Sequence, residues 1–173
     1  NESLKKDFLF LNNYKITGFG AIDITSYFAT FQNKIVFFTN KGIKKNETIP
    51  YENCLIKKAI YKQDVLVMIL YNRLTKKEEL FIYDLKLKKQ QLIQSATIEN
   101  QLISDVLLDV QGNIWVSTYG AGLFKIFKED IYIANHNITS ENIIDVFEGN
   151  QKVYFIAAHK LFQIDKTTQK IDS

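Results

Sequence analysis

The sequence predicts an all-β chain in which one unit of roughly 39–40 residues recurs about four times, and three observations support this. The 22 Tyr and Phe residues, the many Ile and Val residues and the single Pro are typical of strands, because such side chains pack well on a pleated surface. Apolar runs alternate with turn residues at a constant period. Each period holds three clear strands and a weaker fourth, which predicts four-stranded antiparallel blades and therefore a β-propeller fragment.

The repeat is clearest in residues 105–126, which run strand, turn, strand, turn, strand. Asx and Gly residues supply both turns, because they favour local hydrogen bonding and positive φ. The same order recurs downstream, where Leu107 maps to Phe147, and upstream, where Thr39 maps to Thr118. The weaker fourth strands are expected at residues 48–50, 90–93, 131–134 and 170–171.

The period divides the chain into one partial blade and four complete ones. Residues 1–20 are expected to hold the outer strands of a preceding blade, at 8–11 and 14–17, so the sequence is expected to be excised from a longer array. The four blades that follow are predicted at 21–53, 54–96, 97–140 and 141–173.

One segment has a competing interpretation. Residues 84–95 are rich in Leu, Lys and Gln, so a helix is the alternative there. The alternation of Phe81, Tyr83, Leu85 and Leu87 continues the strand phase and favours a strand.

Composition excludes several classes of function. The net charge is +3 and the lysines come as scattered doublets, whereas a nucleic-acid surface needs charge focused on one face. Cys54 is the single cysteine, so neither an internal disulfide nor a multi-thiolate metal site is possible. No apolar run reaches the roughly 18 residues of a membrane-spanning helix, so no membrane contact is expected in this segment.

No catalytic set or cofactor site is visible, so an enzyme is not predicted. His136 and His159 lie far apart with no further ligand at metal-binding spacing. The adjacent carboxylates Glu78 and Glu79 would point to opposite faces of a strand, whereas acid–base catalysis needs two that converge. Residues 18–20 and 120–122 each carry two glycines, which are predicted to lie in turns rather than in a dinucleotide loop.

The unit centred on Trp115 resembles the two-component regulator propeller repeat. The matching residues are Asp109, Gly112-Asn113, Ile114-Trp115-Val116, Thr118, Gly120, Gly122-Leu123 and Phe124. The unit departs from the family at Ser117 and Ala121, where Gly is usual, and the other three units lack the Trp.

The resemblance implies a periplasmic sensor of a membrane-bound histidine kinase, of the kind found in many hybrid kinases of Bacteroidetes, with an oligosaccharide as the typical ligand. A periplasmic or extracellular location follows from this implication. The alternative is a non-signalling cell-surface or secretion-associated propeller that acts as an interaction scaffold for protein or polysaccharide.

Ligand-binding residues are expected in the turn after the second strand of each blade, because loops on a rigid scaffold collect binding residues. The candidates are Tyr119, Lys41, Arg73 and His159, which are expected to line one face together. Trp115, in mid-strand, is predicted to be a core residue. Other propeller blades or a second copy of the chain are the expected partners of the exposed blade faces.

Overall fold

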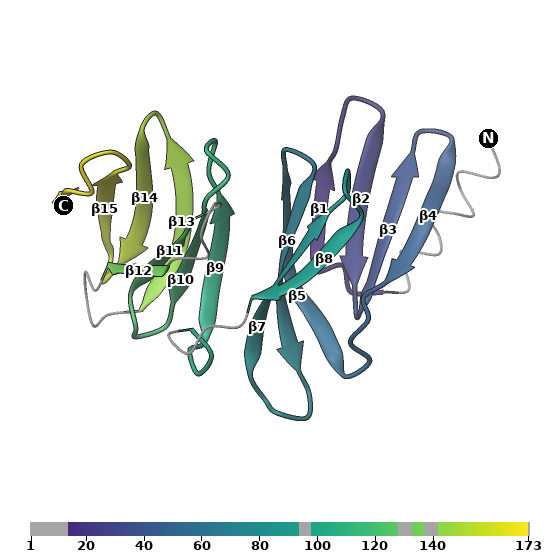
Figure 1. Cartoon of the computed structure of the whole chain (residues 1–173), viewed down its shortest axis with the longest axis horizontal. Helices are drawn as coiled ribbons and strands as arrows, with labels where there is room; N and C mark the ends of the chain where they lie inside the picture. The colour runs from purple at the N-terminus through teal and green to yellow at the C-terminus, as the bar shows by residue number, and fades with distance from the viewer. Residues whose placement is uncertain (1–13, 94–97, 128–132, 137–141, 173) are drawn as a thin grey trace. The chain divides into compact units, whose positions relative to one another are not determined.

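The computed structural model describes residues 14–93, 98–127, 133–136 and 142–172. Within these ranges all regular structure is β-strand: sixteen strands form four sheets of four antiparallel strands each (Figure 1). This confirms the predicted fold class. The chain consists of two compact units, residues 1–94 and 95–173, and each holds two sheets.

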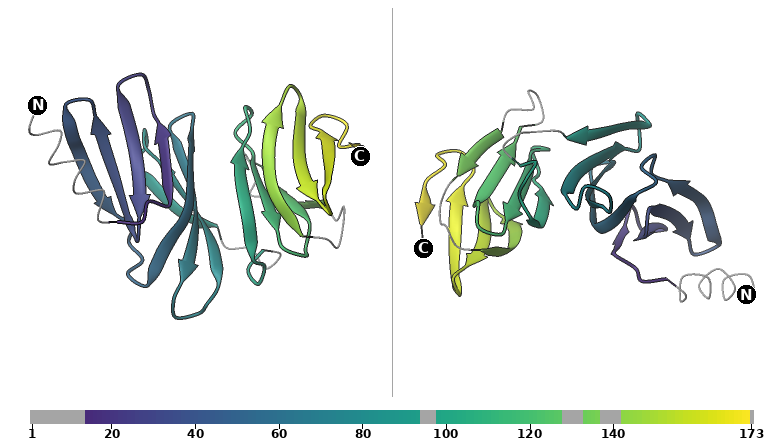
Figure 2. Two further views of the ribbon diagram at one scale, coloured as in Figure 1. Left: turned by 180° about the vertical axis from the view of Figure 1, so that it is seen from behind. Right: turned by 90° about the horizontal axis from the view of Figure 1, so that it is seen from below.

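In every sheet the strands are ordered as in the sequence, so each sheet is a simple antiparallel meander with short turns (Figure 2). The first unit holds β1 (Gly18–Ala21), β2 (Ser26–Phe31), β3 (Lys34–Thr39), β4 (Gly42–Thr48), then β5 (Cys54–Lys62), β6 (Val65–Asn72), β7 (Glu78–Asp84) and β8 (Lys89–Ile93). The second unit holds β9 (Ile103–Leu108), β10 (Ile114–Thr118), β11 (Leu123–Ile126), β12 (Ile133–His136), then β13 (Ile143–Gly149), β14 (Lys152–Ala157), β15 (Lys160–Asp165) and β16 (Ile171–Asp172).

The segment after Tyr83 forms a turn at residues 85–88 and then a strand, so the helical alternative is wrong, and the strand alternation expected through Leu85 and Leu87 ends at Asp84. The carboxylate of Asp84 accepts a hydrogen bond from the backbone N–H of Leu87 at 2.8 Å, which closes the turn. Strand β8 then pairs antiparallel with β7. Side-chain packing of β7 against its neighbours outweighs the helical propensity of Leu and Lys.

The prediction for the start of the chain is wrong in two respects. Residues 14–17 form no strand, whereas Gly18 and Gly20, predicted as turn glycines, lie in strand β1. A Cβ atom on Gly18 would lie 2.9 Å from the Cβ of Ala59 in β5, so the approach of the neighbouring sheet leaves no room for a side chain. The strand expected at residues 8–11 lies outside the described residues.

Because β1 is the first strand of the first sheet, residues 40–41 lie in a different turn of that sheet from the one predicted. The sequence places the turn at residues 40–41 after a second strand, but the structure places it after the third, between β3 and β4. Successive turns of a meander lie at opposite ends of the strands, and each such end of the sheets is called an edge of the unit here. The β1–β2, β3–β4 and β7–β8 turns therefore lie at one edge of the first unit, here called the upper edge (top in Figure 1), and the β2–β3 and β6–β7 turns at the lower edge.

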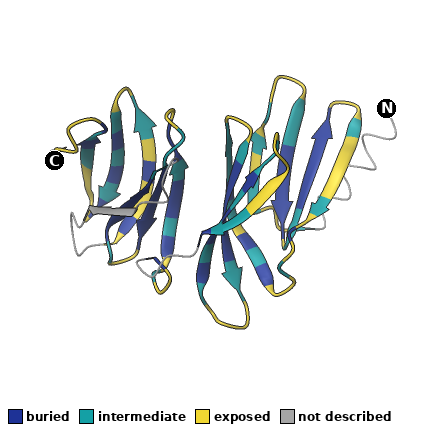
Figure 3. Ribbon diagram, in the orientation of Figure 1, coloured by how far each residue is buried: buried dark blue, intermediate teal, exposed yellow. Residues whose placement is uncertain are grey.

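Each unit has an apolar core between its two sheets (Figure 3). In the first unit, the first sheet contributes Phe28, Ile35 and Phe37, and the second contributes Ile56, Leu66, Met68, Leu70 and Phe81. In the second unit, Trp115 and Leu123 face Ile143, Val153 and Phe155. Face-to-face packing of successive sheets is the arrangement of propeller blades.

The repeat motif around Trp115 has a structural role. Trp115 is fully buried, which confirms its prediction as a core residue, and its indole Nε1 donates a 2.9 Å hydrogen bond to the carboxylate of Asp109. The backbone N–H of Asn113 donates to the same carboxylate at 2.8 Å. Gly120 and Gly122 have φ of 92° and 86°, as their predicted place in a turn requires.

Candidate functional site

The structure separates two of the residues that the sequence predicts to lie together. Lys41 occupies the β3–β4 turn at the upper edge of the first unit, whereas Arg73 occupies the β6–β7 turn at the lower edge. Both side chains are exposed. The prediction of a shared surface is wrong for this pair, because β1 adds a strand before the two that the repeat pattern identified.

The other two predicted residues do share an edge. Tyr119 lies in the β10–β11 turn and His159 in the β14–β15 turn, and both turns join the second and third strands of a sheet in the second unit. Tyr119 is 44% exposed, and the backbone of His159 has a φ of 61°, so its side chain extends from a tight turn. A binding role for these two residues stays a prediction.

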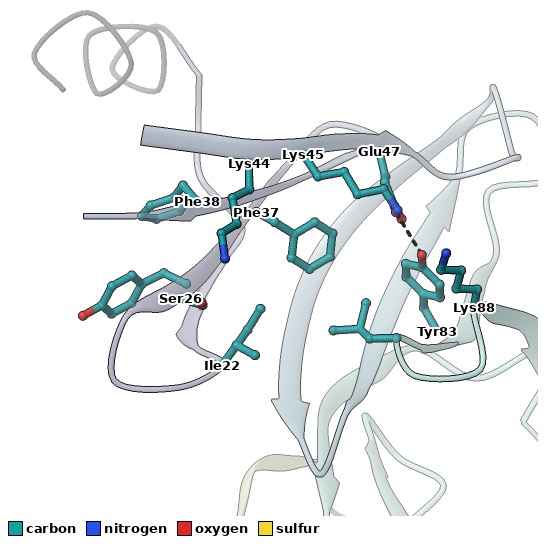
Figure 4. A pocket seen from close by; sticks show the side chains of 11 residues that line it. Ile22, Ser26, Phe37, Phe38, Lys44, Lys45, Glu47, Tyr83 and Lys88 are labelled. Atoms are coloured by element: carbon teal, nitrogen blue, oxygen red, sulfur yellow. Dashed lines mark hydrogen bonds and ion pairs between the residues drawn. The ribbon is translucent and has the colours of Figure 1, made fainter. Parts of the chain in front are cut away.

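A pocket that the sequence did not reveal lies between the first and second sheets of the first unit, on the upper-edge side. Its volume is about 470 Å³, and residues of both sheets line it (Figure 4). The lining residues are Ile22, Ser26, Tyr27, Phe37, Phe38, Lys44, Lys45, Glu47, Tyr83, Leu85 and Lys88.

The apolar part of the pocket is an extension of the core. Phe37 belongs to the cluster between the two sheets, and Ile22 and Leu85 pack against that cluster. Ile22 is the first residue of the β1–β2 turn. The carboxylate of Asp23 stabilises this turn by accepting hydrogen bonds from the backbone N–H groups of Thr25 and Ser26. Leu85 is the first residue of the β7–β8 turn. The two turns thus bring apolar side chains to the mouth of the inter-sheet core.

A β-bulge accounts for the two adjacent lysines. Phe37 pairs with Lys45 and Phe38 pairs with Ile43, so the register shifts and Lys44 is the extra residue of β4. Neighbouring side chains of a regular strand point to opposite faces, and a bulge can re-aim one of them. Because of this shift, Lys44 and Lys45 both line the pocket (Figure 4). Lys88, whose φ of 53° lies in the left-handed region, adds a third ammonium group from the β7–β8 turn.

Glu47 is the one carboxylate among the lining residues, and two neighbours hold it. The hydroxyl of Tyr83 donates a 2.9 Å hydrogen bond to it, and Lys45 forms an ion pair with it (Figure 4). Burial raises the pKa of Tyr83, so its hydroxyl keeps its proton and remains a donor at neutral pH. Within the described part of the chain, Lys44 and Lys88 have no ion-pair partner. The pocket is therefore positively charged.

The described residues contain no group of three His, Cys, Asp or Glu side chains that could hold a metal ion. The same residues contain no helix that is long and apolar enough to cross a membrane. The sequence signal for the pocket was weak, because residues 44–45 form only one of several lysine doublets. The β-bulge, which brings both lysines to the pocket, cannot be recognised from the sequence.

No family model matches the chain, and no curated protein matches it. Solved structures do. The extracellular domain of the putative one component system BT4673 from B. thetaiotaomicron matches with a TM-score of 0.70 at 20% identity, over 94% of this chain and 22% of that one. The extracellular domain of the putative hybrid two component system BT3049 from the same organism matches with a TM-score of 0.62 at 14% identity, over 92% and 22%. A streptogramin B lyase matches with a TM-score of 0.68 at 13% identity, over 91% and 53%.

The chain has the fold of a β-propeller segment. The similar structures include extracellular domains of a one-component and of a hybrid two-component system, and the second is the class of protein that the Trp115 repeat resembles. The chain spans 22% of the length of the BT4673 domain. A lyase shares the fold, so the fold alone does not assign a function, and the side chains of the pocket must be considered.

Proposed function

We propose that this chain is a non-catalytic, ligand-binding segment of the periplasmic or extracellular sensor domain of a two-component system, and that it binds an oligosaccharide in the pocket between the first two sheets. The observation that carries the proposal is the combination, in one 470 Å³ pocket, of an apolar wall with oriented polar groups. Ligand pockets of small molecules have this size and this mixture of side chains. The fold shared with extracellular domains of two-component systems supports the sensor assignment.

The lining residues suit a sugar. Phe37, Ile22 and Leu85 offer apolar surface for the C–H face of a pyranose ring. Glu47 can accept hydrogen bonds from ring hydroxyls, and the lysine ammonium groups can donate to them. The hydrogen bond from Tyr83 to Glu47 holds the carboxylate in one orientation.

The same residues argue against hydrolysis of the sugar. Glycoside hydrolysis ordinarily needs two carboxyl groups that flank the scissile bond. Glu47 is the one carboxylate among the lining residues, and it is engaged by Tyr83 and Lys45. Binding without reaction is the function that this set of groups supports.

The position of the pocket suits signalling. Its walls come from two successive sheets, so a bound ligand contacts both and favours the sheet arrangement to which it binds more tightly. That differential affinity is the physical requirement for transmission along a propeller to a kinase.

A second candidate is a non-signalling interaction scaffold. The observation that favours it is the apolar outer face of the fourth sheet, where Ile144, Phe147 and Leu161 are exposed. Such a face fits another propeller blade or a second copy of the chain.

The test is calorimetric binding of an oligosaccharide panel to the complete extracellular domain that contains this chain. Tyr83→Phe removes only the hydroxyl that orients Glu47, and we expect it to weaken binding roughly tenfold or more, as for one lost hydrogen bond to a charged group. Tyr119→Phe is the matched control in the second unit. If Tyr119→Phe loses affinity and Tyr83→Phe does not, the ligand binds at the edge of the second unit that carries Tyr119, as the sequence predicted. If no oligosaccharide binds, the scaffold function is favoured.

A further inference from the structure

We infer that the ligand of this pocket carries an anionic substituent, a carboxylate or a sulfate ester, next to an apolar ring face. The inference rests on the proposed function, because it specifies the chemical class of the oligosaccharide. It comes from the charge of the pocket, which no sequence motif indicated.

The positive charge comes from both walls. Lys44 and Lys45 extend from β4 of the first sheet, and Lys88 from the β7–β8 turn of the second. Both walls of the pocket therefore carry ammonium groups that can attract an anionic ligand. Charge-assisted hydrogen bonds of this kind are about twice as strong as neutral ones.

The internal ion pair does not cancel this charge. Glu47 is already bound by Lys45 and by the hydroxyl of Tyr83, whereas Lys44 and Lys88 have no ion-pair partner among the described residues. Both lysines are exposed, and their attraction for an anion strengthens as a bound ligand excludes water from the apolar wall that includes Phe37 and Leu85. A neutral sugar would leave both charges uncompensated.

The apolar wall limits the class of anion. Inorganic phosphate or a bare polyanion would leave Ile22, Phe37 and Leu85 uncovered, whereas a uronic acid or a sulfated sugar presents a C–H face and a charged group on one ring. Recognition by both features predicts that acidic and neutral sugars of the same ring geometry differ in affinity.

The experiment compares matched oligosaccharides on the complete extracellular domain by calorimetry. One pair is trigalacturonic acid and α-1,4-galactotriose, and the other is N-acetyllactosamine with and without a 6-sulfate, so each pair has one charged and one neutral member. We expect tighter binding of the acidic member in at least one pair, and the pair that responds identifies carboxylate or sulfate as the anion. Raising the salt concentration should reduce this preference.

The variants Lys44→Gln and Lys88→Gln should each weaken binding of the preferred acidic sugar by roughly fivefold to tenfold, as expected for a partly exposed charged hydrogen bond. Binding of the neutral member should not change. Lys86→Gln is the matched control, because Lys86 is an exposed lysine of the same β7–β8 turn as Lys88 that does not line the pocket.

Two outcomes would overturn the inference, and they differ in what they say of the proposed function. If acidic and neutral members bind equally and the lysine variants match the wild type, the ligand is a neutral sugar, and the sensor proposal stands. If neither member of any pair binds, both the inference and the oligosaccharide proposal are wrong.

Discussion

At the scale of single residues, buried polar groups around Trp115 organise the second unit. The Asp109 carboxylate, fully buried, accepts hydrogen bonds from the Trp115 indole and from Asn113. The ammonium group of Lys125 lies over the Trp115 ring, 5.0 Å from its centroid, in a cation–π contact. Burial lowers the pKa of Lys125, and the negative charge of Asp109 opposes that shift. The residues that mark the repeat motif therefore bind one another rather than a ligand.

This arrangement predicts that Trp115→Ala destabilises the protein by about 3–5 kcal/mol, because the substitution leaves a cavity between the third and fourth sheets. Trp115→Phe should cost less, on the order of 1–3 kcal/mol, chiefly through the lost hydrogen bond to buried Asp109. Chemical denaturation measures both values. Tyr119→Ala, at an exposed position, is the control and should change stability by less than about 0.5 kcal/mol. Wild-type stability of Trp115→Ala would contradict the core role.

At the scale of the secondary-structure elements, the short strand β1 depends on the absence of side chains. Its glycine Gly18 faces Ala59 of β5, and the neighbouring residue Phe19 points away and is 62% exposed. A second departure from regular geometry, the bulge in β4, turns Lys44 and Lys45 toward one opening. The first feature arises from a contact between strands about 40 residues apart, and the second from the pairing of the consecutive strands β3 and β4.

The close approach at β1 predicts that Gly18→Val is destabilising by roughly 1–3 kcal/mol through overpacking against Ala59 and Thr30. Phe19→Val, one residue away on the exposed face, should have a much smaller effect. Thermal denaturation of the two variants provides the measurement. A Gly18→Val protein as stable as the wild type would show that the first two sheets lie farther apart than in the structure.

At the scale of the whole molecule, the outer face of the fourth sheet resembles the face by which the third sheet packs against the fourth. From the third sheet, three residues lie in or against the core between the third and fourth sheets, namely Leu107, Trp115 and Leu123. In the repeat, Phe147, Tyr154 and Leu161 occupy the corresponding positions of the fourth sheet. Asp105 and Asp145 also correspond, and each accepts a hydrogen bond from the backbone N–H of the next residue. The outer face thus has the pattern of a blade-to-blade interface.

We therefore expect the isolated chain to self-associate through the fourth sheet, since Phe147 and Leu161 are 42% and 54% exposed and an apolar sheet face is a common association surface. The double variant Phe147→Lys/Leu161→Lys should shift the protein toward monomer in sedimentation velocity. Lys substitutions at the exposed Leu74 and Leu87 of the first unit serve as the control. A wild-type chain that stays monomeric at all accessible concentrations would contradict this expectation.

The strands, the turns and the core were largely predictable from the sequence, because each depends on a local pattern. Short apolar runs mark β9 and β10, Asx and Gly residues mark the turns, and the mid-strand position of Trp115 indicates burial. The repeat then predicts four-stranded sheets, which the structure contains.

Only the tertiary structure decided which strands belong to the first sheet and where the pocket lies. Gly18 is a strand residue because Ala59 of another sheet lies against it, and that contact moves Lys41 to the edge opposite Arg73. The pocket needs the register shift at Lys44 and the approach of Tyr83 and Lys88 from the second sheet. Inter-sheet packing joins residues about 40 positions apart, and strand pairing decides the register of the bulge, so a local pattern of side chains carries no information about either.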